Sequence, residues 1–122
     1  MAKQYLLVLL LIGFINTAKA DYTVIAGSTI DASTITSQTG VLTINGTLTV
    51  SSNTNLSSFT SVIINGPNGK INWTNNSDLI FSATVSFDNN NTDVNGGLQS
   101  TGGNGSQRLY IGTTIIAVSS DN

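Results

Sequence analysis

One stretch of the sequence has the residue types and the spacing that begin a calcium-binding loop. Oxygen-bearing side chains alternate with other residues in Asn91-x-Asp93-x-Asn95, and Gly96 follows as a turn residue. Calcium binds carboxylate and amide oxygens arranged in this way, but the last position of such a loop supplies a bidentate Glu. That position here is Gly102. The pattern leaves calcium binding open, and we predict no metal site and no cofactor.

The composition gives little support to catalysis. The chain has no Cys, no His and no Glu, which excludes thiolate or imidazole metal sites and any Ser/His or Cys/His catalytic pair. Hydrolysis of sugars needs two convergent carboxylates, and a lyase acting on acidic sugars needs Lys or Arg beside them. The available groups are scattered along the chain: Asp31, Asp78, Asp88, Asp93, Lys70 and Arg108. We therefore expect no enzyme activity and predict no catalytic residue.

Two aromatic residues have the chemistry to stack on sugar rings. Trp73 follows Ile71 in an i, i+2 apolar pair, so we expect Trp73 in the core. Tyr110 is the other candidate. A row of exposed aromatic side chains would indicate a polysaccharide-binding module.

The first residues carry the three parts of a secretory signal peptide. Lys3 provides a positive charge, residues 5–15 are a short apolar run, and Ala18-Lys19-Ala20 matches the small-x-small cleavage pattern. The apolar run is too short to span a membrane, which needs ~20 residues. We predict a signal peptide over residues 1–20 and a secreted mature chain over residues 21–122, with no membrane span after signal removal.

The mature chain is rich in Thr, Ser and Asn and poor in charge. Charged residues make up only 8% of the sequence, and Lys plus Arg number only 4, so we expect no nucleic-acid partner. Helix formers are scarce, whereas Val, Ile and Thr are abundant and fit pleated strands. Gly and Asn recur every few residues, as turns require.

Apolar residues recur in i, i+2 pairs, the period of a strand with one buried face. These pairs repeat along the chain in three sets, which are Tyr22, Leu42, Val62, Val85 and Leu109; Leu48 and Ile71; and Leu56 and Leu79. The spacing within each set is roughly 20–24 residues, with about three short strands in each unit, and a period of this length predicts stacked units.

The turn sequence Ile-Asn-Gly recurs as well. Asn45-Gly46 returns as Asn65-Gly66 one unit later, and Asp88 takes the corresponding place in the next unit. Asn and Asp suit turns, and stacked Asn side chains hydrogen-bond along a stack. We therefore expect a corner column at these positions. In the alternative interpretation, Asn45-Gly46 is the turn of an antiparallel hairpin.

These patterns predict an all-β fold over residues 21–122, a right-handed parallel β-helix or short β-solenoid. The mature length allows about four rungs and a partial fifth. Matching offsets in successive rungs place Ile44, Ile64 and Phe87 in one buried stack. The alternative fold is an antiparallel β-sandwich of about seven strands.

The last apolar segment, residues 109–118, is predicted to be a strand without a cap. It carries Leu109, Ile111, Ile115 and Val118. An uncovered apolar edge strand pairs readily with another chain. We therefore expect self-association through an open C-terminal edge.

One segment, residues 66–71 (GPNGKI), is similar to the Asn-Pro-Asn-Gly-Ile motif of haemagglutinin-like secretion domains, with Gly66 in place of the first Asn and Lys70 inserted before Ile71. The export signal, the Ser/Thr/Asn-rich rungs and the lack of Cys resemble secreted adhesin-type parallel β-helix proteins of Gram-negative bacteria, in the style of surface proteins of the Bacteroidetes. The resemblance covers most of residues 22–118 and implies an extracellular, structural or adhesive role. It carries over no functional residues.

The expected function is that of an exported structural or adhesive β-solenoid module at the cell surface or outside the cell. Its expected partner is a surface glycan or a protein receptor. The alternative is a polysaccharide-binding module and, less favoured, a sugar-acting enzyme. An exposed aromatic row would favour the binding module, and Asp clustered with Lys70 or Arg108 would favour the enzyme.

Overall fold

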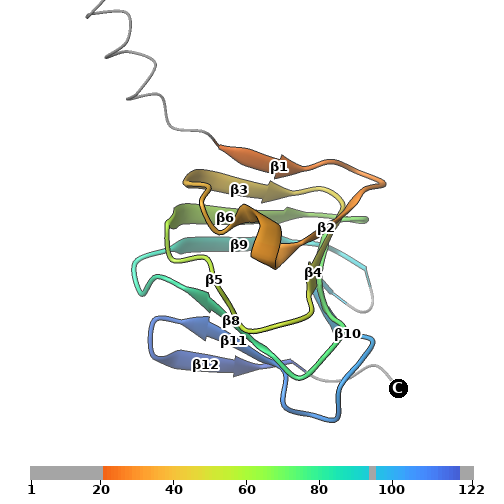
Figure 1. Cartoon of the computed structure of the whole chain (residues 1–122). Helices are drawn as coiled ribbons and strands as arrows, with labels where there is room; N and C mark the ends of the chain where they lie inside the picture. The colour runs from red at the N-terminus through yellow and green to blue at the C-terminus, as the bar shows by residue number, and fades with distance from the viewer. Residues whose placement is uncertain (1–20, 94–95, 119–122) are drawn as a thin grey trace, which may run out of the picture.

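The computed structural model describes residues 21–93 and 96–118, and these form an all-β chain wound into a β-solenoid (Figure 1). In chain order the described elements are β1 (Tyr22–Val24), β2 (Thr29–Asp31), the 3-10 helix η1 (Ala32–Ile35), β3 (Gly40–Ile44), β4 (Thr47–Val50), β5 (Thr54–Asn55), β6 (Phe59–Asn65), β7 (Lys70–Trp73), β8 (Asp78–Phe81), β9 (Ser86–Asn90), β10 (Leu98–Ser100), β11 (Arg108–Ile111) and β12 (Thr114–Ala117).

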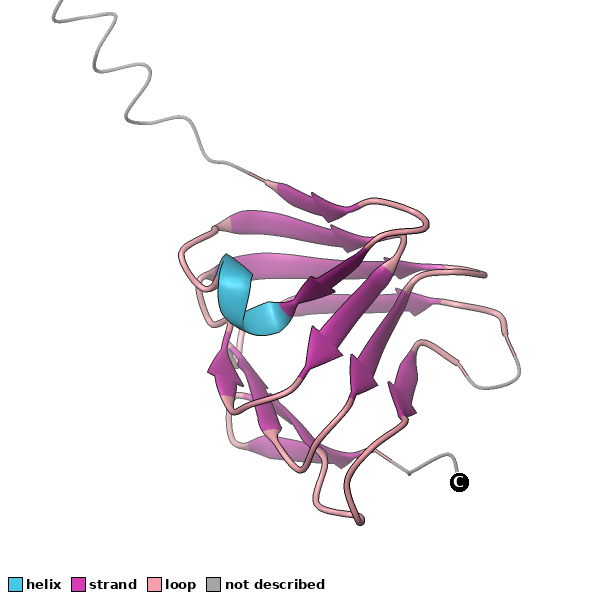
Figure 2. Cartoon of the chain, turned by 45° about the vertical axis from the view of Figure 1, so that its right-hand side comes forward, coloured by secondary structure: helices cyan, strands magenta, loops and turns pink. Residues whose placement is uncertain are grey.

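In this part of the chain, three sheets form the walls of the solenoid (Figure 2). Sheet A has the order β1-β3-β6-β9, sheet B has β2-β4-β7-β10, and sheet C has β5-β8-β11-β12. From β1 to β11, consecutive strands lie in different sheets. The chain forms a first, partial turn with β1 and β2, and then about three complete turns from A to B to C, which are β3–β5, β6–β8 and β9–β11. The pairings of the described strands are parallel except that of β11 with β12. The predicted solenoid is confirmed, and the antiparallel sandwich is wrong.

The alternation of apolar and polar residues gives each sheet an inner, buried face and an outer face. In β3 and β4, Leu42, Ile44, Leu48 and Val50 are fully buried, while the residues between them are half-buried on the outer face. Successive side chains of a strand point to opposite faces, so each turn sends every second residue into the lumen. Full burial of such a side chain stabilises the fold by about 1.5–3 kcal/mol.

The predicted columns are confirmed in the first three turns and wrong in the fourth. Tyr22, Leu42 and Val62 lie in register in sheet A. The next member of this column is Phe87, not Val85. Connections at the solenoid corners vary in length because loops at the surface tolerate insertions. A prediction that assumes a constant number of residues per turn therefore assigns the wrong register partner in the fourth turn.

Three further register predictions have mixed outcomes. Leu48 and Ile71 are register partners, as predicted. Leu109 is a partner of Leu79 in sheet C, so its place in the sheet A column was wrong. The partner of Leu79 in β5 is Thr54 rather than the expected Leu56, which is buried just beyond that strand.

The predicted buried stack is confirmed for two of its three members. Ile44 and Ile64 are register partners and both are fully buried. Phe87 is wrong in this stack, because it lies beside Val62 and is half-buried, while Asn89 takes the place beside Ile64. The offset predicted for the fourth turn is therefore wrong by one inward position.

The repeated Asn-Gly sequence forms a corner between sheets A and B. Asn65 Nδ2 donates to Asn45 Oδ1 over 2.9 Å, which confirms the predicted Asn contact along the stack. The hairpin interpretation is wrong, because β3 and β4 on either side of Asn45 belong to different sheets. The next member of the column is Asn90, and Asp88 lies beside Ile63 instead.

Gly46 is required at this corner by the close stacking of turns. A Cβ at this position would collide with the carbonyl oxygens of Ile25 and Ser28 in the preceding turn. Only glycine has no Cβ, so it lets the backbones approach closely. The corner therefore packs one turn directly on the next.

The two ends of sheet C are covered in different ways. At the N-terminal end, η1 buries Ala32 and Ile35 and contacts β5. At the C-terminal end, residues 109–118 form two strands rather than the predicted single one, because the chain turns at Gly112 with a φ of 62° and β12 returns antiparallel along β11. The edge of β11 that was predicted to be open is therefore occupied by β12.

Candidate functional site

The outer face of sheet B carries a continuous set of uncharged and charged polar side chains. Because Ile30, Leu48 and Ile71 point inward as register partners, the residues on either side of them point outward. We call this surface the B face, and its members are Thr29, Asp31, Thr47, Thr49, Lys70, Asn72 and Gln99.

Hydrogen bonds hold three members of the B face in place, and these are Asp31, Thr49 and Asn72. The Asp31 carboxylate accepts from Ser51 Oγ at 2.6 Å, from the backbone N–H of Ser33 at 3.0 Å, and from Thr49 Oγ1 at 3.4 Å. Two turns on from Asp31, Asn72 Nδ2 donates to Thr101 Oγ1 of the following turn at 2.9 Å. Such side chains are already ordered before any partner arrives.

The environment of Asp31 changes its titration. Partial burial is the largest single influence and raises the pKa of Asp31. The hydrogen bonds from Ser51, Ser33 and Thr49 together outweigh it, so the pKa of Asp31 is lowered from its ordinary value. Asp31 therefore stays ionised on the B face.

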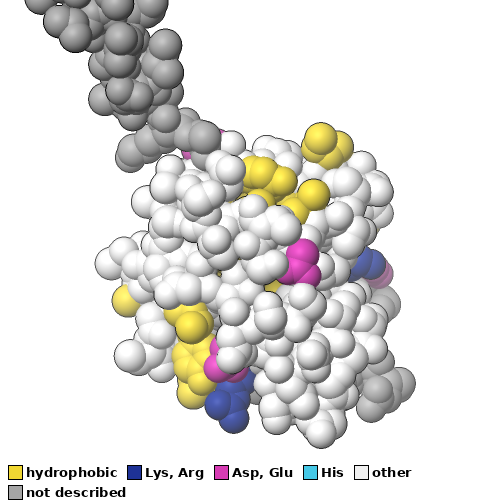
Figure 3. Space-filling view, viewed as in Figure 1, with side chains coloured by type: hydrophobic (Ala, Val, Ile, Leu, Met, Phe, Trp, Pro, Cys, Tyr) yellow, Lys and Arg dark blue, Asp and Glu magenta, His cyan; other side chains and the backbone are white. Residues whose placement is uncertain are grey.

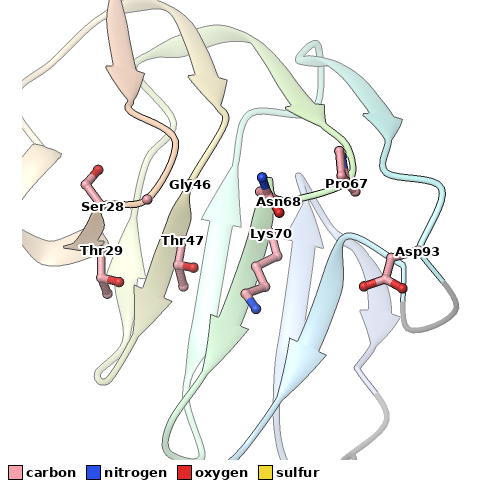
Figure 4. Close-up of a pocket in the computed structure, with 9 residues that line it drawn as sticks. Ser28, Thr29, Gly46, Thr47, Pro67, Asn68, Lys70 and Asp93 are labelled. Atoms are coloured by element: carbon pink, nitrogen blue, oxygen red, sulfur yellow. The ribbon is translucent and has the colours of Figure 1, made fainter.

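A polar hollow of about 390 Å³ lies where the B face meets the corner with sheet A (Figure 4). Four successive turns contribute to it, and Figure 4 shows Lys70 and Asp93 entering it from different turns. Its polar lining consists of Ser28, Thr29, Thr47, Asn68, Lys70 and Asp93. Hydroxyl, amide, ammonium and carboxylate groups of this kind can hydrogen-bond a polyhydroxylated ligand.

The calcium-loop pattern does not form a compact loop. The segment between Asn91 and Gly102 contains β10, so these two residues lie at opposite ends of a strand. Asn91 Oδ1 accepts from the backbone N–H of Asp93 at 2.8 Å, and Asn91 Nδ2 donates to Pro67 O at 3.3 Å, which ties the loop to the preceding turn. Asn95 lies outside the described residues.

The acidic residues Asp31, Asp78, Asp88 and Asp93 do not gather with one another in the fold, although Asp93 shares the hollow with Lys70 and Asp78 lies beside Arg108. Asp31 lies on the B face, Asp93 lies at the corner between sheets A and B, and Asp88 lies on the outside of sheet A. The described part of the chain contains no group of three or more His, Cys, Asp or Glu residues that could hold a metal ion. Asp78 is the register partner of Arg108 on the outside of sheet C.

The outer face of sheet C carries an apolar patch beside this charged pair. Tyr110 is the register partner of Ile80 and of Ile115, and all three side chains point outward. Figure 3 shows hydrophobic side chains gathered at the lower left, over β8, β11 and β12, beside one acidic and one basic group. We call Ile80, Tyr110 and Ile115 the C patch.

The two aromatic residues considered as sugar-stacking candidates differ in burial. Trp73 is fully buried, as predicted, between Val50 and Ser100 in sheet B. Tyr110 is half-buried, and its hydroxyl accepts a hydrogen bond from Arg108 Nη1 at 3.4 Å. This hydrogen bond is the largest cause of a raised pKa of Arg108, and the electrostatic influence of Tyr110 and of the Asp78 carboxylate adds to it.

Sequence reasoning missed both surfaces. The steps from Leu48 to Ile71 and from there to Leu98 differ, so the fourth strand of sheet B was not aligned and Gln99 was not placed beside Asn72. The neighbourhood of Asp78 and Arg108 likewise depends on a step longer than those between the earlier turns. An alignment of the apolar pairs that allows the corner loops to lengthen along the chain would have revealed the B face and the C patch.

The predicted signal peptide, residues 1–20, lies outside the described residues. In the part of the chain that the structure describes, no helix has the length and apolar character that a membrane span requires. No family model, no curated protein and no solved structure matches this chain.

Proposed function

We propose that this protein is an exported structural or adhesive β-solenoid module, acting at the cell surface or outside the cell, and that the B face is its contact surface. The observation that carries the proposal is the hydrogen bonding of Asp31, Thr49 and Asn72 between turns, which orders this polar face in advance. A surface ordered in advance loses less side-chain entropy when it binds.

The chemistry of the B face fits a glycan or the polar surface of a receptor. Its hydroxyl and amide groups both donate and accept hydrogen bonds. The adjoining hollow adds Lys70 and Asp93 at the same corner. The proposal involves no catalytic step.

Export is tested on the full chain. Cells that express it are fractionated, and the mass of the protein in the medium or surface fraction is measured. A mature chain beginning at Asp21 supports the proposal. Recovery of intact Met1 outside the cell contradicts the signal peptide.

Adhesion is tested with two matched variants of the mature chain. Thr47→Tyr places a bulky ring on the B face, and Thr43→Tyr places the same ring on the outer face of sheet A. Both positions are half-buried in central strands, and Tyr suits strands, so both variants should fold. Binding to a glycan array and to cells should fall roughly tenfold or more for Thr47→Tyr only. An equal loss in both variants, or in neither, rejects the B face.

A polysaccharide-binding module is the second candidate, and the half-exposed ring of Tyr110 favours it. An aromatic ring beside Arg108 and Asp78 offers both a stacking platform and hydrogen-bonding groups. Tyr110→Ala should then abolish polysaccharide binding in calorimetry while Thr47→Tyr leaves it unchanged. The opposite pattern assigns binding to the B face.

The proposal also includes self-association through the C-terminal end of the solenoid. Exposed apolar side chains remain there, since Ile115 is 55% exposed and Ile116 is 39% exposed. An apolar strand edge of this kind pairs readily with another chain.

A further inference from the structure

The three sheets present different strand edges at the C-terminal end of the solenoid. Among the described residues, β9 ends sheet A, β10 ends sheet B and β12 ends sheet C, each with a strand on one side only. Figure 1 shows β12 as the last strand of the stack. Each edge is a place where a second chain can add a strand.

The side chains of these edges favour β12 as the pairing strand. β9 has the sequence SFDNN, so pairing two copies of β9 brings the charge of Asp88 close to its own copy. β10 has only three residues. β12 has the uncharged sequence TIIA, and both of its isoleucines are exposed.

The free backbone groups of β12 can be assigned from its pairing with β11. The N–H of Val118 donates to Gln107 O, so Val118 points its backbone groups toward β11. Backbone direction alternates along an antiparallel strand, so Ile116 and Thr114 also face β11. The N–H and C=O groups of Ile115 and Ala117 therefore face the open edge.

We infer that two copies of this chain associate by antiparallel pairing of β12 with β12, around a two-fold axis that runs perpendicular to sheet C. Identical strands that pair in an antiparallel sense form an isologous contact, in which the same surface is used by both copies. The contact is closed, so it yields a dimer and not a fibre. Sheet C then continues from one copy into the other.

The backbone directions allow registers centred on Ile115 or on Ile116, and the burial of side chains selects the register centred on Ile116. Placing Ile116 opposite Ile116 of the second copy lets Ile115 of each chain exchange hydrogen bonds with Ala117 of the other. Ile116 then occupies a non-hydrogen-bonded pair, in which side chains approach most closely. Because Ile116 shares a face with the fully buried Leu109, the pairing extends the apolar interior across the two-fold axis.

This inference rests on the self-association in the proposed function and specifies its geometry. The geometry also determines which residues of the edge can be changed to test the dimer without damaging the fold. Ile111 is half-buried against the core, so a charge there would damage the fold as well as the edge. Ile115 shares its face with the outward Tyr110, so its side chain can be changed without entering the core.

The mature chain is examined by analytical ultracentrifugation over a range of concentrations, beside Ile115→Pro and Ile115→Lys. Proline at position 115 removes an N–H that faces the open edge and leaves the bonds between β11 and β12 in place. The parent should reach a dimer and stop. Both variants should weaken the dimer roughly tenfold or more. The matched control is Ile25→Lys, which changes an exposed isoleucine at the N-terminal end of the solenoid and should leave the dimer unchanged.

A single-cysteine variant tests the register. The chain has no Cys, so Ile116→Cys carries one thiol. A non-hydrogen-bonded pair holds its Cα atoms ~4.5 Å apart, within the range for a disulfide. Mild oxidation should cross-link Ile116→Cys into a covalent dimer, and the control Ile25→Cys should stay monomeric on a denaturing gel.

The outcomes separate this inference from the proposed function. A parent that stays monomeric at high concentration contradicts both the self-association and the β12 pairing. A parent that associates equally well with Pro or Lys at position 115, that grows into open-ended oligomers, or that fails to cross-link through position 116 overturns the β12 pairing alone. Binding by the B face is measured separately and is unaffected by any of these results.

Discussion

The middle turns of the solenoid, β3–β5 and β6–β8, and the last turn, β9–β11, differ in how well their inward side chains are covered. Leu42, Val62 and Ile71 are fully buried in the middle turns. Phe87 and Leu98 occupy the same columns in the last turn and are only partly buried. The residues are equally apolar, so burial here depends on having a neighbouring turn on both sides and not on residue type.

The same comparison explains where polar residues are tolerated inside. Asn89 and Ser100 occupy inward positions of the last turn, where the middle turns have Ile64 and Trp73. Ser100 Oγ donates to Gly102 O at 2.7 Å, and Asn89 is exposed to solvent. A polar group at the end of the stack finds a partner or water, whereas one in a middle turn needs a partner inside the fold, as Thr54 Oγ1 has in donating to Ser52 O at 2.9 Å.

A charge inside a middle turn should have the largest effect. Ile64→Lys buries a charge with no partner, which costs about 3–5 kcal/mol and leaves little of the stability of a small domain. Ile63→Lys places the same charge on the outer face and should cost below ~1 kcal/mol. Urea unfolding followed by circular dichroism measures both. Similar midpoints for the two variants would show that the inward assignment is wrong.

Shortening inward side chains of one sheet B column to alanine should show that a middle turn loses more stability than the last turn. Ile71→Ala opens a cavity between two covering turns and should lower the free energy of unfolding by about 2–5 kcal/mol. Leu98→Ala removes a side chain that is already partly exposed and should cost about 1–2 kcal/mol. Both are read from urea unfolding midpoints. A larger loss for Leu98→Ala would mean that the last turn is covered by another chain.

Acidification tests the N-terminal end of the same stack. The pKa of Asp31 is lowered in the fold, so its stabilising effect is complete above the unfolded value of ~3.9 and is lost as the pH falls through the lower folded value. Asp31→Asn replaces charge-assisted hydrogen bonds by neutral ones and should cost about 1 kcal/mol at neutral pH, and the difference in stability from the parent should shrink below pH ~4. Asp88→Asn, on the exposed β9, is the matched control. Thermal melts across this pH range measure the stability of each variant relative to the parent. A difference between Asp31→Asn and the parent that stays constant with pH contradicts the role of the carboxylate.

The column of Asn side chains at the corner between sheets A and B should give the smallest difference in stability between the middle turns and the last turn. Asn65→Ala removes the hydrogen bond to Asn45 and should cost about 0.5–1.5 kcal/mol. Asn90→Ala changes the same column in the last turn, where the side chain is exposed, and should cost less. Precise denaturant midpoints compare the two. Equal losses would show that the Asn column is continuous through the last turn.

Local pattern was sufficient to predict the architecture. The alternation around Leu42 and Leu48, the recurrence of Asn45-Gly46 and the step from Leu48 to Ile71 all depend on short-range periods, which a strand and a stacked turn impose directly on the sequence. Burial of Trp73 followed from the same alternation. No candidate site was predicted, and neither the B face nor the C patch could be recognised before the turns were aligned.

The sequence by itself determined that this chain forms short strands with one buried face and that these strands recur at a spacing suited to stacking. Only the tertiary structure decided the register of the last turn, the return of β12 along β11 and the contact between Asp78 and Arg108 as register partners. The physical reason is that strand alternation is set by neighbouring residues, whereas the alignment of turns depends on the lengths of corner loops, which have little effect on stability and so vary freely.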